Sequence, residues 1–238
     1  MHHRHLAAGT AGTALALLAT GCSSGTSASP SSTPSATTTA SSPPAAKLTA
    51  ATAAGAVKAA YRSATAVHII GRVTKGGQTS TFDLRLDKNG SAGGTVSYKS
   101  AQMPIRLVHG VAYLQFTTSV LKAAKVPAAM VGKWISSNSA TGKGMAKAFR
   151  PLLSYTTFVG GLVGQIPAGL TGGAATTIGR IKVQAFKART GEMFYISESD
   201  PHYLVRAIAP HGAGRMDFTA WNHPFSISAP TAAQLFKG

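Results

Sequence analysis

Side chains that perform acid–base or nucleophilic chemistry are scarce in this sequence. The chain of 238 residues has 6 Asp and Glu residues, 8 His residues and a single Cys. The carboxylates are Asp83, Asp87, Glu192, Glu198, Asp200 and Asp217. Asp83 and Asp87 fall on the polar face of one predicted strand, where solvation or pairing with Arg85 and Lys88 explains them better than catalysis does. No G-x-S-x-G nucleophile elbow occurs either, so we expect no catalytic residues and no enzyme.

Sites for phosphate, metal or nucleic acid are also not predicted. The segment SATGKGM (139–145) is similar to a phosphate-binding loop, but Ser137 stands where the first glycine belongs and Gly144 replaces the final Ser or Thr. The later histidines lack the i, i+3 or i, i+4 spacing of a helical metal site; they are His68, His109, His202, His211 and His223. Lys and Arg are spread along the chain without an arginine-rich helix or an interleaved aromatic platform. We expect no cofactor, no metal and no nucleic-acid partner.

The single cysteine, Cys22, has a recognisable context. It follows Arg4, an uncharged segment over 6–19 and the small residues of LLATGC (17–22). Together these features resemble a lipoprotein signal peptide that ends in a bacterial lipobox. The resemblance implies cleavage before Cys22 and a diacylglycerol thioether on its sulfur, whose two acyl chains hold a protein stably on a membrane. The alternative is an ordinary secretory signal with an unused thiol, but a lone cysteine in an exported chain has no disulfide partner.

Residues 23–46 contain only Ser, Thr, Pro, Ala and one Gly. Such a composition buries too little apolar surface to offset the entropy of ordering. We therefore divide the chain into a lipoprotein signal peptide (1–21), the lipidated cysteine with a Ser/Thr/Pro-rich disordered tether (22–46), and one folded domain (47–238). This organisation predicts a protein that is lipid-anchored on the extracytoplasmic face of the cell membrane.

Positive charge dominates the sequence, with 23 Lys and Arg against 6 Asp and Glu. The formal net charge of +17 favours anionic partners. For an exported, lipid-anchored protein we expect this partner to be the anionic membrane surface. The alternative is a basic surface that only keeps the protein soluble.

The apolar periodicity of the folded part changes along the chain. Leu48, Ala51, Val57, Tyr61 and Ala64 fall on one side of a helix. From Val67 the period becomes two, which predicts strands at 67–73, 81–87, 95–99, 104–108 and 111–116. Residues 117–167 return to helical spacing, with breaks at two prolines. Strands resume at 180–186, 192–198, 203–209 and 214–221, and 225–228 would add one more.

These elements predict an α+β fold. Strands that follow one another in sequence pair as antiparallel neighbours, and the turn dipeptides Asn89-Gly90 and His109-Gly110 suit tight hairpins. A sheet of nine or ten such strands curls, and the helical segments are available to cover its concave face. The fold class is therefore a strongly curved antiparallel β half-barrel covered by helices.

Several segments resemble the LppX and LprAFG lipoproteins of actinobacteria. They are SATAVHIIGRV (63–73), FDLRLDKNG (82–90), VHGVAYLQ (108–115), GKWIS (132–136), YLVRAIAP (203–210) and MDFTAWNHPFSISAP (216–230). The resemblance spans about residues 45–238 and implies a LolA-like fold, in which the half-barrel encloses an apolar cavity. It also implies that the cavity binds acylated lipids or glycolipids, which the protein carries within the cell envelope.

Alternating strands offer such acyl chains one dry face. The residues expected to point inward and line the cavity are Ile69, Phe82, Leu84, Leu86, Leu107, Leu114, Ile181 and Val183. Residue type does not distinguish a ligand cavity from a packed core. We expect a monomer, with an envelope transporter as a further partner that this function allows. The alternatives are a non-enzymatic envelope module that binds proteins or senses lipid state, and an unrecognised hydrolase.

Overall fold

The computed structural model describes residues 48–98, 101–124 and 127–237. The contacts within the chain group residues 44–238 as one unit. The predicted signal peptide, Cys22 and the predicted tether lie outside the described residues. No helix within the described ranges is long and apolar enough to span a bilayer.

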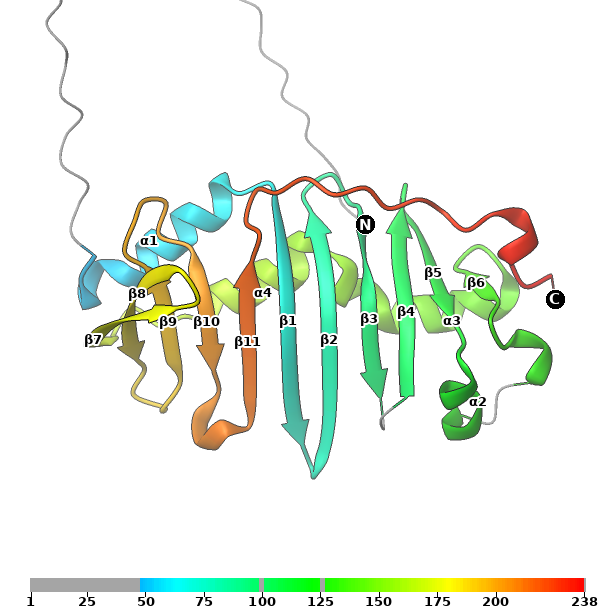
Figure 1. Ribbon diagram of the computed structural model, residues 1–238, viewed down its shortest axis with the longest axis horizontal. Coiled ribbons are helices and arrows are strands. Elements are labelled where there is room, and N and C mark those ends of the chain that lie inside the picture. The colour runs from blue at the N-terminus through cyan, green and yellow to red at the C-terminus, as the bar shows by residue number, and fades with distance from the viewer. Residues whose placement is uncertain (1–47, 99–100, 125–126, 238) are drawn as a thin grey trace, which may run out of the picture. The chain divides into compact units, whose positions relative to one another are not determined.

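An antiparallel sheet of eleven strands forms the body of this unit (Figure 1). The strands are β1 (Ala66–Lys75), β2 (Gln78–Asp87), β3 (Ala92–Tyr98), β4 (Ala101–Val108), β5 (Val111–Gln115), β6 (Trp134–Ser136), β7 (Thr171–Ile178), β8 (Ile181–Lys187), β9 (Met193–Ser197), β10 (Leu204–Ile208) and β11 (Gly214–Thr219). Their spatial order is β6-β5-β4-β3-β2-β1-β11-β10-β9-β8-β7. The first meander (β1–β6) and the second meander (β7–β11) therefore meet where β1 pairs with β11, and β6 and β7 are the two edges of the sheet.

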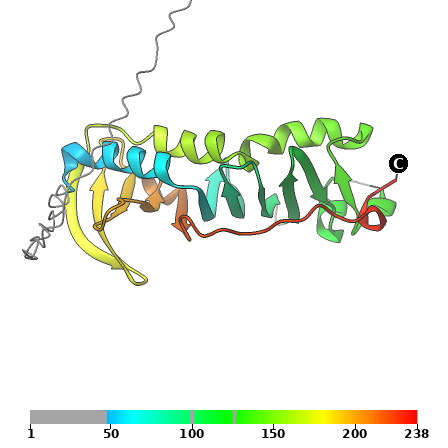
Figure 2. The ribbon, with the colours of Figure 1, turned by 90° about the horizontal axis from the view of Figure 1, so that it is seen from above.

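The helices are α1 (Ala50–Ser63), α2 (Thr118–Ala124), α3 (Ala140–Phe149) and α4 (Gly160–Gly164), with the 3₁₀ turns η1 (Ala128–Met130), η2 (Arg150–Leu153), η4 (Pro210–Gly212) and η5 (Ala232–Gln234) and the π-helical turn η3 (Tyr155–Val159). Of these, α1, α3 and α4 lie along one face of the sheet (Figure 2). Four of these segments, α3, η2, η3 and α4, follow one another along the sheet. Pro151 lies at their first break, as expected for a residue that cannot donate a helical hydrogen bond.

Helix α1 begins at a capping box. The Thr49 side chain accepts from the Thr52 backbone, and the Thr52 side chain accepts from Thr49 in return. The predicted helix is therefore present, and Val57 is buried as expected. Ala51 is exposed, because Ala53 and Ala54 occupy the buried side instead.

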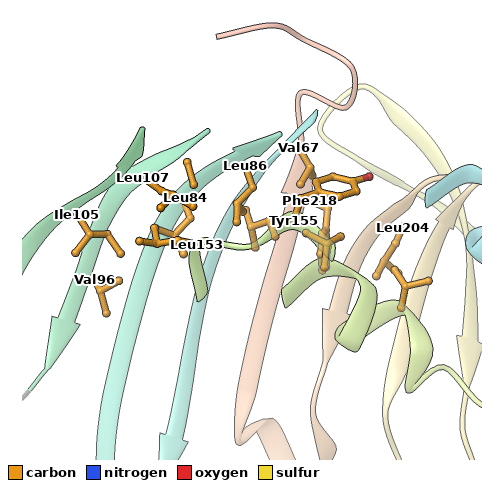
Figure 3. Close-up of a cluster of buried hydrophobic side chains, with 14 of the residues drawn as sticks. Val67, Leu84, Leu86, Val96, Ile105, Leu107, Leu153, Tyr155, Leu204 and Phe218 are labelled. Carbon is orange, nitrogen blue, oxygen red and sulfur yellow. The ribbon is translucent and has the colours of Figure 1, made fainter. Parts of the chain in front are cut away.

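The core lies between the helices and the inner face of the sheet. Ile69 on β1 stands opposite Leu84 on β2 and Phe218 on β11, and all three side chains are buried. Leu153 and Tyr155 reach this cluster from the helical side (Figure 3). The predicted fold class, a curved antiparallel half-barrel covered by helices, is confirmed.

Three details of the sheet differ from the prediction. Strand β6 lies inside the region expected to be helical, and β7 was not predicted because TGGAATTI has no alternation of apolar and polar residues. The strand predicted at 225–228 is wrong, since these residues belong to no strand. Ile227 instead packs on Gly93 of β3, and the Ser228 carbonyl accepts a hydrogen bond from Arg106.

Candidate functional site

An apolar pocket of about 340 Å³ lies between the inner face of the second meander and α4. Its volume falls at the lower end of the range for small-molecule sites. The sheet contributes Val73, Phe194, Leu204, Ala207, Met216 and Phe218, and the helical side contributes Leu162, Gln165 and Pro167. The arrangement offers a dry surface of the kind that a hydrocarbon chain requires.

The strand register explains why space remains at this place. Ala207 on β10 stands opposite Phe194 on β9 and Met216 on β11. A methyl group between two large side chains leaves volume that a larger residue would fill. On the helical side, α4 ends at Gly164, and Pro167 follows shortly after it. This short helix covers the pocket without filling it.

Polar residues gather at the rim of the pocket. Thr190 is exposed and donates a hydrogen bond to Glu192, which also lines the pocket. Arg215 also borders the pocket, but it alternates with the inward Met216 on β11, so its exposed side chain lies on the outer face, where Nε donates to Asp217 at 2.8 Å. Gln165 from the end of α4 completes the polar lining. An apolar interior with charged and hydrogen-bonding groups at its mouth suits an amphiphile, with its tail inside and its polar end at the surface.

None of the eight predicted cavity residues lines this pocket. Five of them belong to the packed core: Ile69, Leu84, Leu86, Leu107 and Leu114. Phe82 is half-buried and packs edge-to-face on Phe158, with ring centroids 5.6 Å apart. In the structure described here, the inner face of the first meander is therefore filled by side chains.

The inward orientation expected for Ile181 and Val183 is wrong. Phe186 of β8 stands opposite Phe194 of β9, and both belong to the core, so the residues of β8 that share a face with Phe186 point inward. Val183 stands opposite Ser197, on the other face of the sheet. It is buried there, whereas Ile181 is 40% exposed. The apolar residues Ile181, Val183 and Ala185 alternate with other residues along β8, so periodicity assigns these three to the inner face. The structure instead turns the other set of β8 residues, which includes Phe186, toward the core.

The pocket residues that the sequence analysis missed come mainly from β9, β10 and β11. Phe194, Ala207, Met216 and Phe218 all lie in strands that the sequence predicts. Phe218 stands opposite Ile69 when β11 is paired with β1, and the alternation of side chains along β11 then places Phe218 on the inner face. No signal in the sequence distinguishes Ala207 as the residue that leaves a space, because that depends on what stands opposite it.

A second depression, of about 680 Å³, lies on the outer face of the sheet. Its lining includes Arg72, Asp83, Arg215 and Asp217. Asp217 pairs with Arg206 at 2.5 Å and with Arg215 at 2.8 Å. Although this depression is larger, its charged lining does not suit an acyl chain, since burying these groups against hydrocarbon is costly. Across the described ranges, no cluster of three or more His, Cys, Asp or Glu could hold a metal ion.

Known proteins were compared by sequence and by structure. No family model matches the sequence, and no curated protein matches it. Among solved structures, lipoprotein LppX of Mycobacterium tuberculosis superposes with a TM-score of 0.50 at 17% identity, covering 75% of this chain and 98% of LppX. LprF from Mycobacterium bovis superposes with a TM-score of 0.56 at 13% identity, covering 79% of this chain and 100% of LprF.

The chain has the LppX and LprF fold. The resemblance predicted from the sequence is thereby confirmed at the level of fold. Because the matches cover nearly all of LppX and LprF, the whole half-barrel and its helices are shared, and not only a local motif.

Proposed function

We propose that this protein is a membrane-anchored extracytoplasmic lipoprotein that binds acylated lipids or glycolipids and carries them within the cell envelope. The observation that carries the proposal is the apolar pocket with a polar rim, on the helix-covered side of a sheet with the LppX and LprF fold. No enzymatic step is part of the proposal. The lipobox at Cys22 supplies the anchor, and the Ser/Thr/Pro-rich segment after it supplies the reach from the bilayer.

The pocket suggests how such a lipid binds. Its tail contacts Ala207, Met216 and Phe218, and its polar end lies near Gln165 and Thr190 at the rim. Because 340 Å³ is small for a lipid site, the pocket takes one tail or part of one. A ligand with two or three tails binds only if α4 moves away from the sheet and enlarges the pocket.

Filling the pocket tests this proposal. Ala207→Trp places a large ring between Phe194 and Met216, whereas Ala59→Trp places the same ring on the exposed side of α1. We expect purified wild-type protein and the Ala59→Trp control to yield a stoichiometric acylated species on solvent extraction and mass spectrometry. The Ala207→Trp variant should yield much less. Absence of such a species from the wild-type protein would reject lipid carriage and favour a protein-binding or lipid-sensing module.

A further inference from the structure

Strand β7 differs from every other strand of the sheet in its exposure. Seven of its residues, from Thr171 to Thr177, are exposed, and Ile178 is half-buried. Among the described strands it pairs only with β8. The strand therefore buries almost no side-chain surface, and its free edge presents unpaired backbone N–H and C=O groups.

The opposite edge of the sheet is protected. Strand β6 has only three residues, and the C-terminal segment covers it. Leu235 forms a parallel bridge with Trp134, and the Phe236 N–H donates to the Trp134 carbonyl at 2.9 Å. A very short edge that is covered by another segment is a usual defence against pairing with other chains.

Strand β7 has few such defences. Its sequence, TGGAATTI, contains no charged residue and no proline. A register shift between Gly172 and Ala175 disturbs its first half, but Ala175 to Ile178 pair with β8 in regular register. This stretch offers a template of four residues for an added strand, which binds through main-chain hydrogen bonds.

The charges on β8 and in its flanking turns are positive, and the carboxylates Glu192 and Glu198 flank β9, one strand farther from this edge. Arg180, Lys182, Lys187 and Arg189 are exposed on β8 or next to it, and Lys182 stands directly opposite Thr177. None of the four forms an ion pair within the described residues. A strand added to β7 would lie two strand spacings from β8, roughly 10 Å, which is slightly more than the Debye length of about 8 Å at physiological ionic strength, so the attraction is only partly screened. Acidic side chains on that strand would be attracted, and basic ones repelled.

We propose that the free edge of β7 binds an extended acidic peptide segment of a partner protein as a twelfth strand. The positive charges select this occupant over a second copy of the chain, because two β7–β8 hairpins paired edge to edge would bring the same four cations together. The inference is independent of lipid binding, since β7 contributes nothing to the apolar pocket.

A synthetic peptide tests the proposal on the full-length protein. The probe is a fluorescein-labelled peptide of eight residues that alternates valine and glutamate, and fluorescence anisotropy measures its binding. One control has the same sequence with every backbone nitrogen methylated, which removes the donors that strand addition needs. The other alternates valine and lysine. We expect the acidic peptide to bind, its binding to weaken as salt is raised, and both controls to show no detectable binding.

Proline variants locate the binding edge. Adjacent residues of an edge strand direct their backbone groups alternately toward the neighbouring strand and toward solvent. Of Thr176→Pro and Thr177→Pro, one should therefore disrupt the β7–β8 ladder, and the other should keep the wild-type unfolding temperature while losing peptide binding. Equal binding of the methylated peptide, no binding of the acidic peptide, or full binding by the stable proline variant would each overturn the proposal. So would a dimer in sedimentation that Thr176→Pro or Thr177→Pro dissolves, since the edge would then pair with a second copy.

Discussion

Phe82 occupies the space that a side chain at Gly71 would need. The two residues stand opposite each other on β2 and β1, and a Cβ atom built on Gly71 would overlap the Phe82 ring. The ring also packs on Phe158 of the helical layer. Glycine at position 71 therefore lets an aromatic side chain cover the backbone and connect the sheet to the helices.

Replacing Gly71 by alanine should destabilise the protein. Because the ring must leave its position, we expect the free energy of unfolding to fall by about 1–3 kcal/mol, measured by urea denaturation. Gly55→Ala is the matched control, since Gly55 is exposed within α1 and nothing lies within 4 Å of its added Cβ. That control should gain roughly 0.5–1 kcal/mol from the better helix propensity of alanine. An unchanged stability of Gly71→Ala would contradict the packing described here.

Tyr155 joins the helical layer to α1. Its hydroxyl donates to the Tyr61 carbonyl at 3.1 Å, and the two rings stack with centroids 5.2 Å apart. Burial, followed by the charges of Tyr61 and Tyr203, raises the pKa of Tyr155 above its ordinary value. The folded protein therefore keeps this proton at alkaline pH, where the unfolded chain releases it.

This difference makes the free energy of unfolding depend on pH. Below about pH 10 the Tyr155 hydroxyl is protonated in both the folded and the unfolded state, so its ionisation costs the folded state no stability. Above about pH 10 only the unfolded state releases the proton, and the free energy of unfolding falls by up to about 1.4 kcal/mol per pH unit. We expect Tyr155→Phe to lose less stability than the wild-type protein as the pH rises above 10. Denaturation curves at several pH values measure this, and the two proteins should run parallel between pH 8 and 9. Equal slopes above pH 10 would show that Tyr155 ionises freely in the folded state.

At the scale of elements, the C-terminal segment from 222 to 237 closes the β6 edge. Lys133 Nζ donates to the Ala233 carbonyl at 3.0 Å, and Arg106 lies 4.4 Å from the centroid of the Trp134 ring. Trp134 is only 4% exposed, although it lies on a three-residue edge strand. The burial of this ring therefore depends on neighbours that are distant in sequence.

Removing this segment should expose Trp134. We expect a truncation after His223 to shift the Trp134 fluorescence emission to longer wavelength and to lower the unfolding temperature. Because the chain has 2 Trp residues, the measurement is made with Trp221→Phe in both the full-length and the truncated protein. A blue emission that persists in the truncated protein would mean that other residues bury the ring.

Sequence periodicity predicts the long strands well and the edges poorly. Val67 to Val73 and Phe82 to Leu86 alternate because one face is buried by helices, so β1 and β2 can be read directly. Strand β7 buries no face and leaves no such pattern. The segment from Phe225 to Ser228 alternates like a strand, but it crosses the outer face and pairs with no strand. The pocket was equally unpredictable, because it arises from Ala207 opposite two larger residues on neighbouring strands.

At the scale of the whole unit, charge is distributed unevenly over the sheet. No Asp or Glu occurs between residues 88 and 191. This stretch forms β3 to β6, α2 and α3 on one side of the sheet, here called the acid-free half, and also β7 and β8 at the other edge, beside the carboxylates around β9. The remaining carboxylates lie on β2 and β11. The acid-free half has five exposed basic residues: Lys122, Lys133, Lys143, Lys147 and Arg150. One half of the sheet and its helices thus has a positive surface that no carboxylate offsets.

This asymmetry predicts which part of the unit meets an anionic bilayer. We expect the protein with Cys22→Ala, which removes the site of the proposed lipid anchor, to bind vesicles that contain phosphatidylglycerol and to dissociate at high salt. Lys143→Glu with Lys147→Glu should weaken binding by at least about 2 kcal/mol, since each basic residue near the surface contributes about 1 kcal/mol. Lys182→Glu with Lys187→Glu changes the net charge equally, but these residues lie at the opposite edge, near Glu192 and Glu198. If both pairs weaken binding equally in a vesicle sedimentation assay, total charge governs docking, and the acid-free half has no special part in it.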